Sequence, residues 1–197
     1  MVNYDKQYLT EDIKLIAGID EAGRGPLAGP VVVASVIMPL EEDKIIDKIN
    51  DSKKLSEKNR NILFDKIIET AIAYHIESID EKTIDEINIL NATKQGMQNC
   101  IKHLNIQPNL VLIDAVKIES EIPIESIIKG DAKSYNIAAA SILAKVYRDR
   151  LMVEYDKVYP QYNFKKHKGY GTKEHIQNLK EFGKCPIHRD TFIKNFV

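Results

Sequence analysis

The chain has 197 residues, of which 44% are hydrophobic and 29% are charged, a balance typical of a soluble globular protein with one domain. No stretch is long and apolar enough to span a membrane, and residues 1–12 are polar rather than signal-like, so we exclude a membrane protein and expect a cytoplasmic one. The net charge is −1, but the charges are unevenly distributed: residues 129–197 contain 14 Lys and Arg against 7 Asp and Glu. This excess of basic residues fits a polyanion-binding surface and chance clustering equally well.

Two β-strands joined by a glycine-rich loop open the predicted fold. Residues 15–20 and 30–38 are rich in Val, Ile and Ala, which is the composition of buried strands. The loop between them is studded with glycines and carries a single arginine. After a polar segment, Ser56 is a suitable N-cap for a helix that ends near residue 70. A third strand is expected over residues 71–78.

Helices and strands alternate in the rest of the chain. We expect, in order, helices over 80–87 and 90–104, strands over 110–114 and 122–128, a turn over 129–131, and a long helix over 135–156. This order predicts an α/β fold with a mixed five-stranded sheet flanked by helices. We expect one domain over residues 1–197, with a core over about 12–156 and a C-terminal helical and loop portion over about 157–197.

Four acidic side chains stand where predicted strands and a turn end. Asp20 and Glu21 close the first strand, and Asp114 closes the strand over 110–114. Neighbouring parallel strands lie ~4.8 Å apart, and Asp131 opens the long helix, whose dipole favours a carboxylate. We therefore expect the four acids to converge and to bind hard divalent cations such as Mg²⁺. Two such ions ~4 Å apart can activate a water for in-line attack on a phosphodiester.

Strand geometry sets a condition on this site. Consecutive residues of a regular strand point to opposite faces, so Asp20 and Glu21 share a site only if the strand bends there. Gly23 and Gly25 favour such a bend. The alternative is that each acid is a helix cap or a solvated strand end. That alternative suits a single Asp better than it suits an Asp-Glu pair followed by this loop.

Sequence blocks along nearly the whole chain resemble the type 2 ribonucleases H. In chain order these blocks are GIDEAGRGP at 18–26, DSKKL at 51–55, LID at 112–114, KGD at 129–131, AAASILAKVYRD at 138–149, HKGYGT at 167–172 and HR at 188–189. A single glycine loop would be weak support for a family, but many blocks in one order are specific.

The resemblance implies a ribonuclease H-like fold and endonucleolytic cleavage of RNA in RNA–DNA hybrids. It also implies cutting at single ribonucleotides in duplex DNA, with 3′-hydroxyl and 5′-phosphate product ends. From the acids we expect two Mg²⁺ or Mn²⁺ ions in the substrate complex, and because nothing in the sequence points to an obligate dimer we expect a monomer. The implied catalytic residues and metal ligands are Asp20, Glu21, Asp114 and Asp131. The residues implied in substrate binding are Gly23, Arg24 and Gly25, at the ribose 2′-hydroxyl and the backbone, and Tyr170, at the RNA-to-DNA junction.

The physical chemistry of these residues agrees with the implied roles. The 2′-hydroxyl both donates and accepts hydrogen bonds, and a backbone N–H and C=O in the Gly23-Arg24-Gly25 turn can answer both functions. A plain turn would explain the two glycines but not Arg24 between them. Tyr170 stands between two glycines, so its ring can stack on a sugar or base, although a surface tyrosine on a loop is equally consistent.

Polar residues on the long helix form a stripe that has two alternative explanations. Ser134, Ser141, Lys145 and Arg148 fall on one helical face. They either hold a phosphate of the DNA strand, together with Lys53, or form the exposed face of an amphipathic helix, and their spacing supports both equally.

The C-terminal portion carries a second basic segment. Its lysines are interleaved with Tyr162, Phe164 and Tyr170, which favours a loop that faces nucleic acid. Cys185 and His188 are at most half of a zinc site, so we expect structural histidines and two reduced thiols, Cys100 and Cys185.

Two other functions remain open. One is a different metal-dependent nuclease of the ribonuclease H-like fold, which would cut all-DNA and ribonucleotide-containing duplexes equally. The other is a non-catalytic nucleotide-binding module, in which the glycine loop cradles a phosphate. Such a module would tolerate substitution of Asp114 and Asp131.

Overall fold

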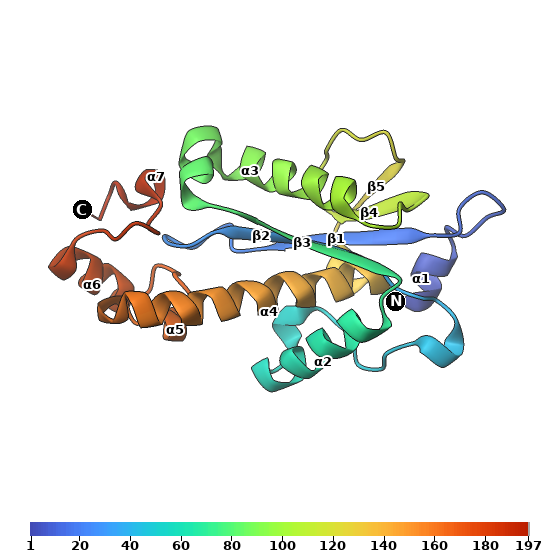
Figure 1. Cartoon of the computed structure of the whole chain (residues 1–197), viewed down its shortest axis with the longest axis horizontal. Coiled ribbons are helices and arrows are strands. Elements are labelled where there is room, and N and C mark those ends of the chain that lie inside the picture. The colour runs from blue at the N-terminus through green and yellow to red at the C-terminus, as the bar shows by residue number, and fades with distance from the viewer. Residues whose placement is uncertain (197) are drawn as a thin grey trace.

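Five strands form one mixed sheet in the order β3-β2-β1-β4-β5 (Figure 1). The computed structural model describes residues 1–196, so Val197, the last residue of the expected domain, lies outside the described residues. Pairing is antiparallel between β1 and β2 and between β2 and β3, and parallel between β1 and β4 and between β4 and β5. The strands are β1 Ile16–Ala22, β2 Val31–Ile37, β3 Ala73–Ile79, β4 Leu110–Asp114 and β5 Ile124–Ile127.

Helices cover both faces of this sheet. The long helix α3 lies on one face, α4 lies on the other with α2 packed against it, and the last helices extend beyond one end of the sheet (Figure 1). The helices are α1 Val2–Lys6, α2 Glu57–Thr70, α3 Glu81–His103, α4 Tyr135–Val158, α5 Phe164–His167, α6 Lys173–Phe182 and α7 Asp190–Ile193. Among residues 1–196, no helix combines the length and apolarity needed to cross a membrane.

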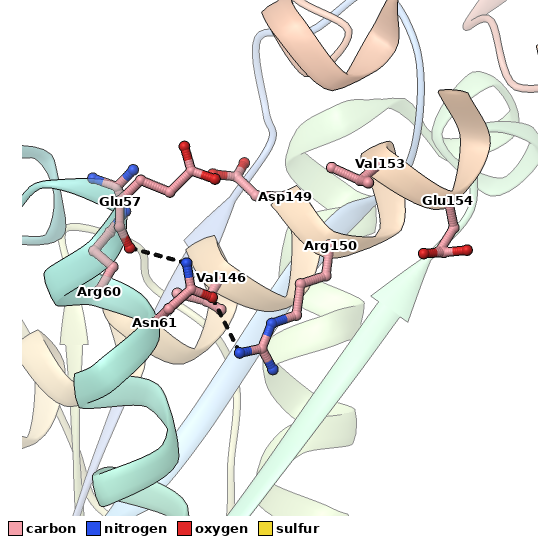
Figure 2. Close-up of a pocket in the computed structure, with 8 residues that line it drawn as sticks. All are labelled: Glu57, Arg60, Asn61, Val146, Asp149, Arg150, Val153 and Glu154. Atoms are coloured by element: carbon pink, nitrogen blue, oxygen red, sulfur yellow. Dashed lines mark hydrogen bonds between the residues drawn. The ribbon is translucent and has the colours of Figure 1, made fainter. Parts of the chain in front are cut away.

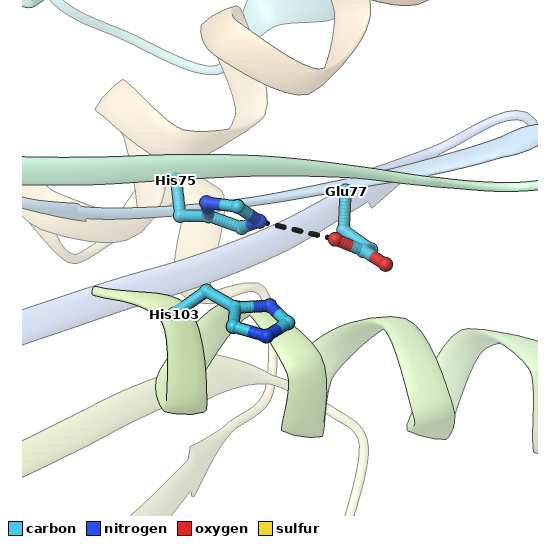
Figure 3. Close-up of side chains that lie close together, drawn as sticks. All are labelled: His75, Glu77 and His103. Atoms are coloured by element: carbon cyan, nitrogen blue, oxygen red, sulfur yellow. Dashed lines mark hydrogen bonds and ion pairs between the residues drawn. The ribbon is translucent and has the colours of Figure 1, made fainter. Parts of the chain in front are cut away.

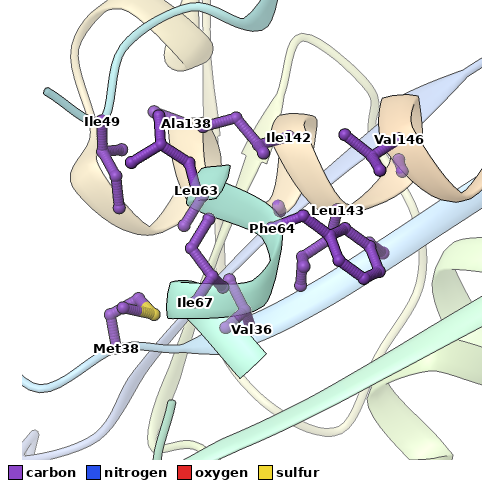
Figure 4. Close-up of a cluster of buried hydrophobic side chains, with 14 of the residues drawn as sticks. Val36, Met38, Ile49, Leu63, Phe64, Ile67, Ala138, Ile142, Leu143 and Val146 are labelled. Carbon is purple, nitrogen blue, oxygen red and sulfur yellow. The ribbon is translucent and has the colours of Figure 1, made fainter. Parts of the chain in front are cut away.

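The largest group of buried apolar side chains lies between β2, α2 and α4 (Figure 4). Ile67 of α2 is fully buried there against side chains such as Val36 of β2 and Leu143 of α4. A second group, including Met97 of α3 and Ile19 of β1, fills the opposite face. The sheet is therefore apolar on both faces, which explains why its central strands read as continuous hydrophobic runs.

The central strand and α4 approach each other unusually closely at Gly18. A Cβ on Gly18 would lie 2.1 Å from the backbone carbon of Asn136, in the first turn of α4. Only glycine fits between the two backbones. This contact brings the N-terminal end of α4, and the turn that precedes it, over the carboxyl end of β1.

Local signals in the sequence placed most of these elements. Ser56 caps α2 by accepting a hydrogen bond from the Asn59 N–H, as expected, and Ser134 caps α4 in the same way. The two helices expected over 80–104 form α3, which is broken at Asn88 by non-helical backbone angles (φ 65°, ψ 164°). The Asn88 side chain accepts hydrogen bonds from the N–H groups of Leu90 and Asn91, so it caps the second part.

In the N-terminal part the structure adds one element and corrects one expectation. Helix α1 was not expected, and its buried Asp5 accepts hydrogen bonds from the backbone and side chain of Asn136. The bend expected at Asp20 and Glu21 comes later, at Gly23, whose φ is 97°. Strand β1 pairs regularly with β2 as far as Ala22, opposite Val32, because backbone hydrogen bonding continues past the first acid.

Candidate active site

Three carboxylates from three separate elements converge at the carboxyl ends of β1 and β4. One oxygen from each of Asp20, Asp114 and Asp131 lies within 4.8 Å of the others. The parallel register between β1 and β4 explains the first two, because the last paired residues, Ile19 and Ile113, stand immediately before the acids. Asp20 and Asp131 are buried, and Asp114 is half-buried.

The turn after β5 fixes the third acid. Lys129 adopts the left-handed conformation (φ 57°, ψ 48°), and Gly130 then donates its N–H to the Asp114 carboxylate at 2.8 Å. A short 3-10 helix over Gly130–Ala132 carries Asp131 directly before the cap of α4. The hydrogen bond from Gly130 therefore ties the turn that bears one acid to the side chain of another.

Burial and mutual repulsion make the charged carboxylate form of these acids less favourable. Burial raises the pKa of Asp20 well above its ordinary range, and the charges of Glu21, Asp114 and Asp131 raise it further. Burial and the neighbouring Asp114 also raise the pKa of Asp131. Such a group of acids is stabilised by a cation placed between its members.

Lys53, expected to join the polar residues of the long helix at a phosphate, lies beside this acid cluster. Its ammonium nitrogen is 3.7 Å from the Asp131 carboxylate, and the side chain is largely exposed. Burial lowers the pKa of Lys53, but the charges of Asp131 and Asp20 outweigh this effect and raise the pKa overall. Lys53 therefore supplies positive charge at the rim of the acid cluster.

Glu21 lies next to the three acids but outside the group within 4.8 Å. Alternation along the regular strand directs Asp20 toward α4 and Glu21 toward the α3 face. One oxygen of Glu21 is 3.4 Å from the Arg24 guanidinium, and the other is buried without a hydrogen-bond partner. Burial raises the pKa of Glu21, against the effect of Arg24. A buried carboxylate oxygen without a partner is a candidate ligand atom.

A buried arginine of the C-terminal portion forms hydrogen bonds with the glycine loop over residues 23–29. Arg189 is fully buried and donates hydrogen bonds to the carbonyl oxygens of Gly23 (2.6 Å), Arg24 (3.0 Å) and Gly29 (2.9 Å). Burial lowers its pKa to about 9. No role for Arg189 follows from the sequence, because no local pattern separates a buried arginine from an exposed one.

Arg148 of α4 also supports the glycine loop. It was expected on a polar helical face that contacts phosphate or solvent, and that expectation is wrong. Its guanidinium donates to the carbonyl oxygens of Pro30 (2.9 Å), Lys168 (2.9 Å) and Ala28 (3.1 Å), and only 1% of the residue is exposed. Burial lowers its pKa to about 10. Gly23 has a positive φ of 97°, and a Cβ there would lie 2.0 Å from the Arg148 Nε, so both backbone and space require glycine.

The other polar residues expected to share that helical face are also tied into the fold. Ser134 is buried as the α4 cap, and Ser141 is buried with its hydroxyl donating to the Ala138 carbonyl. Lys145 remains partly exposed and is 2.8 Å from Asp149. Burial of Ser141 does not favour direct contact with substrate, whereas Lys145 keeps access to solvent.

Tyr170 lies against the glycine loop, as expected if both contact the same substrate. A Cβ on Gly25 would be 3.9 Å from the Tyr170 ring, and the Arg148 guanidinium carbon lies 5.9 Å from the ring centroid. Tyr170 is 43% exposed, so one part of the ring is free to meet a ligand. The structure therefore brings Tyr170 and Gly25 together from segments about 145 positions apart in the chain.

The basic C-terminal segment differs from the expected nucleic-acid-facing loop. Tyr162 and Phe164 are buried and stack with ring centroids 5.2 Å apart, so these two aromatics belong to the core. Lys166 pairs with Glu174 at 2.6 Å, and Lys165 lies 3.6 Å from Asp156. Tyr162 and Phe164 are therefore used for apolar packing within the C-terminal portion, and of the three aromatic residues only Tyr170 lies at the surface.

Buried histidines support the Tyr170 loop. The rings of His167 and His175 stack at 4.5 Å, and the Nε2 atoms of His175 and His188 are 3.0 Å apart. His175 Nδ1 also lies 3.0 Å from the Tyr170 carbonyl oxygen. Burial lowers the pKa of both His175 and His188 to about 4, which favours neutral imidazoles. The expected structural role of these histidines agrees with this arrangement.

A shallow depression of about 130 Å³ lies between α2 and α4, away from the acids (Figure 2). Arg150 donates to the Asn61 side chain across it at 3.1 Å. Residues of both charges line it, including Glu57, Arg60 and Asp149. This mixed lining gives no single ligand chemistry.

The chain matches the family model described as Ribonuclease HII over residues 17–195. It is 57% identical to a ribonuclease HII of Acetivibrio thermocellus, covering 100% of this chain and 77% of that protein. It is 53% identical to one of Caldicellulosiruptor bescii, covering 98% and 93%.

Solved structures show the same fold. The ribonuclease H2 of Pyrococcus horikoshii superposes with a TM-score of 0.77 at 27% identity, covering 90% of this chain and 93% of that one. The ribonuclease HII of Archaeoglobus fulgidus, solved in a complex with PCNA, gives a TM-score of 0.78 at 26% identity, covering 91% and 94%. With its mixed sheet, its converging acids and these relatives, the chain belongs to the ribonuclease HII family, and its activity is that of an endoribonuclease acting on RNA–DNA hybrids.

Proposed function

We propose that this chain cuts the RNA strand of RNA–DNA hybrids, and duplex DNA at single embedded ribonucleotides, with divalent cations held by Asp20, Glu21, Asp114 and Asp131. The observation that carries this proposal is the convergence of three carboxylates from β1, β4 and the turn before α4 within 4.8 Å. Acids so close together and so poorly compensated are typical of a site built for cations.

The donor atoms fit a hard divalent ion. All are carboxylate oxygens, which suit Mg²⁺ and Mn²⁺ better than softer metals. The unpartnered oxygen of Glu21 provides a further ligand at the edge of the group. A solved ribonuclease HIII in complex with Mn²⁺ shares the fold, with a TM-score of 0.66 at 16% identity. We expect two ions in the substrate complex.

Divalent cations, when bound, supply Lewis-acid stabilisation of the attacking and leaving oxygens in an in-line displacement. The four carboxylates would hold the cations, and these would offset the charge of the scissile phosphate while a water attacks the phosphorus opposite the leaving 3′-oxygen. Cleavage of the P–O3′ bond by water then gives 3′-hydroxyl and 5′-phosphate ends. The 2′-hydroxyl is recognised and not consumed, so no cyclic phosphate forms.

The glycine loop and Tyr170 distinguish ribose from deoxyribose in this proposal. The carbonyls of Gly23 and Arg24 accept from Arg189, and each carbonyl oxygen retains a second lone pair for a 2′-hydroxyl. Gly25 adds no side chain that would block the approach of a ribose. The Tyr170 ring beside Gly25 is placed to stack on the adjoining deoxyribose. Lys53 and Lys145 remain proposed phosphate contacts.

One cleavage assay separates this function from its rivals. Duplexes with a single ribonucleotide, a full RNA–DNA hybrid and an all-DNA duplex are incubated with Mg²⁺ or Mn²⁺, and the product ends are identified. We expect cutting of the first two only, with 5′-phosphate ends. Equal cutting of the all-DNA duplex would favour another nuclease of this fold, and binding without cutting would favour a nucleotide-binding module. We also propose that the chain acts as a monomer.

A further inference from the structure

A second group of metal-ligating side chains lies on the α3 face of the sheet, at its edge. It consists of His75 and Glu77 of β3 and His103, the last residue of α3 (Figure 3). One ligand atom from each of the three residues lies within 4.8 Å of the others. We propose that this group, the His75–Glu77–His103 cluster, binds a divalent transition-metal ion of the Zn²⁺ class.

Regular secondary structure produces the cluster. His75 and Glu77 are two positions apart on a strand, so both side chains point to the same face, the one that α3 covers. Helix α3 runs across this face and ends at His103, directly over the pair (Figure 3). The negative end of the α3 dipole at its C-terminus also favours a cation there.

The carboxylate is already oriented for binding. The amide of Asn99 donates to one oxygen of Glu77 at 3.0 Å, and the other oxygen is 3.0 Å from His75 Nε2. Asn99 is thus an outer partner that fixes the direction of a ligating carboxylate. A tetrahedral ion with bonds of about 2.1 Å needs ligand atoms about 3.4 Å apart. The exposed His103 ring therefore has to move inward by a short distance only.

The donor set selects the metal. Two imidazoles and one carboxylate favour Zn²⁺, Co²⁺ or Ni²⁺, whereas Mg²⁺ prefers oxygen ligands. Three protein ligands leave a fourth position for water. His75 and Glu77 are partly exposed, so an ion can enter from solvent.

The cluster is separate from the acid site. Glu77 pairs with Val33, and Val33 in turn pairs with Glu21, so a fully buried valine lies between the two carboxylates on this face. A bound ion would link the C-terminal end of α3 to the edge strand β3. The consequence is stabilisation of the folded chain by the metal.

Titration with Co²⁺ in a saturating excess of Mg²⁺ tests this proposal. We expect one equivalent of Co²⁺ to bind with visible absorption typical of nitrogen ligands, displaceable by Zn²⁺, and Zn²⁺ to raise the melting temperature. In His103→Ala and Glu77→Gln we expect affinity to fall at least 10-fold. Lys102→Ala, a neighbouring exposed substitution, and Asp114→Asn, which alters the acid cluster, should both keep the Co²⁺ site.

Two outcomes would overturn the proposal. One is the absence of Co²⁺ binding at millimolar metal. The other is binding that is lost in Asp114→Asn and unchanged in His103→Ala, which would assign the ion to the acid cluster. Because His103 is exposed at a helix end, its alanine variant is expected to fold, and circular dichroism confirms this independently of metal.

Discussion

The guanidinium of Arg189 donates a 2.6 Å hydrogen bond to the carbonyl oxygen of Gly23. The last tenth of the chain thereby holds the loop that follows β1, the strand that carries Asp20. With two further donor contacts, to Arg24 and Gly29, Arg189 supports this loop together with Arg148, which donates to Ala28 and Pro30.

Replacing Arg189 should damage both stability and activity. Arg189→Ala leaves three loop carbonyls without their donor, at a cost of about 1–3 kcal/mol for a buried polar group that loses its partner. We expect a loss of roughly 3 kcal/mol in the free energy of unfolding, and slower cleavage even where the variant is folded. Urea unfolding and single-turnover cleavage measure the two effects. Arg150→Ala, an exposed arginine of α4, is the control, and equal behaviour of the two variants would refute the role of Arg189.

Neutralising an acid of the cluster should abolish activity without unfolding the chain. In Asp114→Asn and Asp131→Asn we expect cleavage in Mg²⁺ to fall at least about 100-fold, because metal charge stabilisation is worth several kcal/mol. Without divalent ions, Asp131→Asn should melt higher than wild type, because removing one charge relieves the repulsion that raises the pKa of Asp20 and Asp131. Asp12→Asn, an exposed acid, should change neither property. Wild-type turnover in Asp131→Asn would remove that residue from the site.

Removal of the Tyr170 hydroxyl should impair recognition and not metal binding. For Tyr170→Phe we expect cleavage at a single ribonucleotide to fall about 5- to 10-fold, the value of one hydrogen bond of about 1 kcal/mol. The ring, its packing beside Gly25 and the dependence on Mg²⁺ concentration should persist. Tyr147→Phe, on the exposed part of α4, is the matched control. Unchanged kinetics in Tyr170→Phe would place the hydroxyl outside the substrate site.

Lys145 should contact one phosphate of the substrate. Lys145→Ala is expected to weaken binding and to reduce the slope of log affinity against log salt by about one. Lys157→Ala provides the comparison, because Lys157 lies on the same helix and pairs with Glu154 as Lys145 pairs with Asp149. If both variants keep the wild-type slope, Lys145 contacts no phosphate and its role is limited to the ion pair with Asp149.

The buried histidines predict that stability falls in mild acid. Burial lowers the pKa of His175 and His188 from 6.5 to about 4, so the unfolded chain binds more protons than the native one between these values. Their contribution is complete above pH 6.5 and is lost as the pH falls toward 4. Urea unfolding at several pH values measures it. His175→Gln, which cannot be protonated, should flatten the slope, and His103→Gln, an exposed histidine, should leave it unchanged. A wild-type slope in His175→Gln would contradict this origin.

Local patterns in the sequence determined the elements and the positions of the acids. Strands β2 and β4 follow from runs of apolar residues, and Ser56 marks the start of α2, because these signals depend on near neighbours alone. The expected meeting of Asp20 and Asp114 followed from two strands that each end on an acid.

The tertiary structure alone decided the roles of polar residues whose partners lie far away in the sequence. Arg148 reads as part of a solvent-facing stripe, yet it binds three carbonyl oxygens in the interior, because the chain folds α4 against the loop. The roles of Arg189 and His175, and the meeting of His75 with His103, likewise depend on segments far apart in sequence. Burial and hydrogen-bond partners are properties of the packed chain, and no local pattern records them.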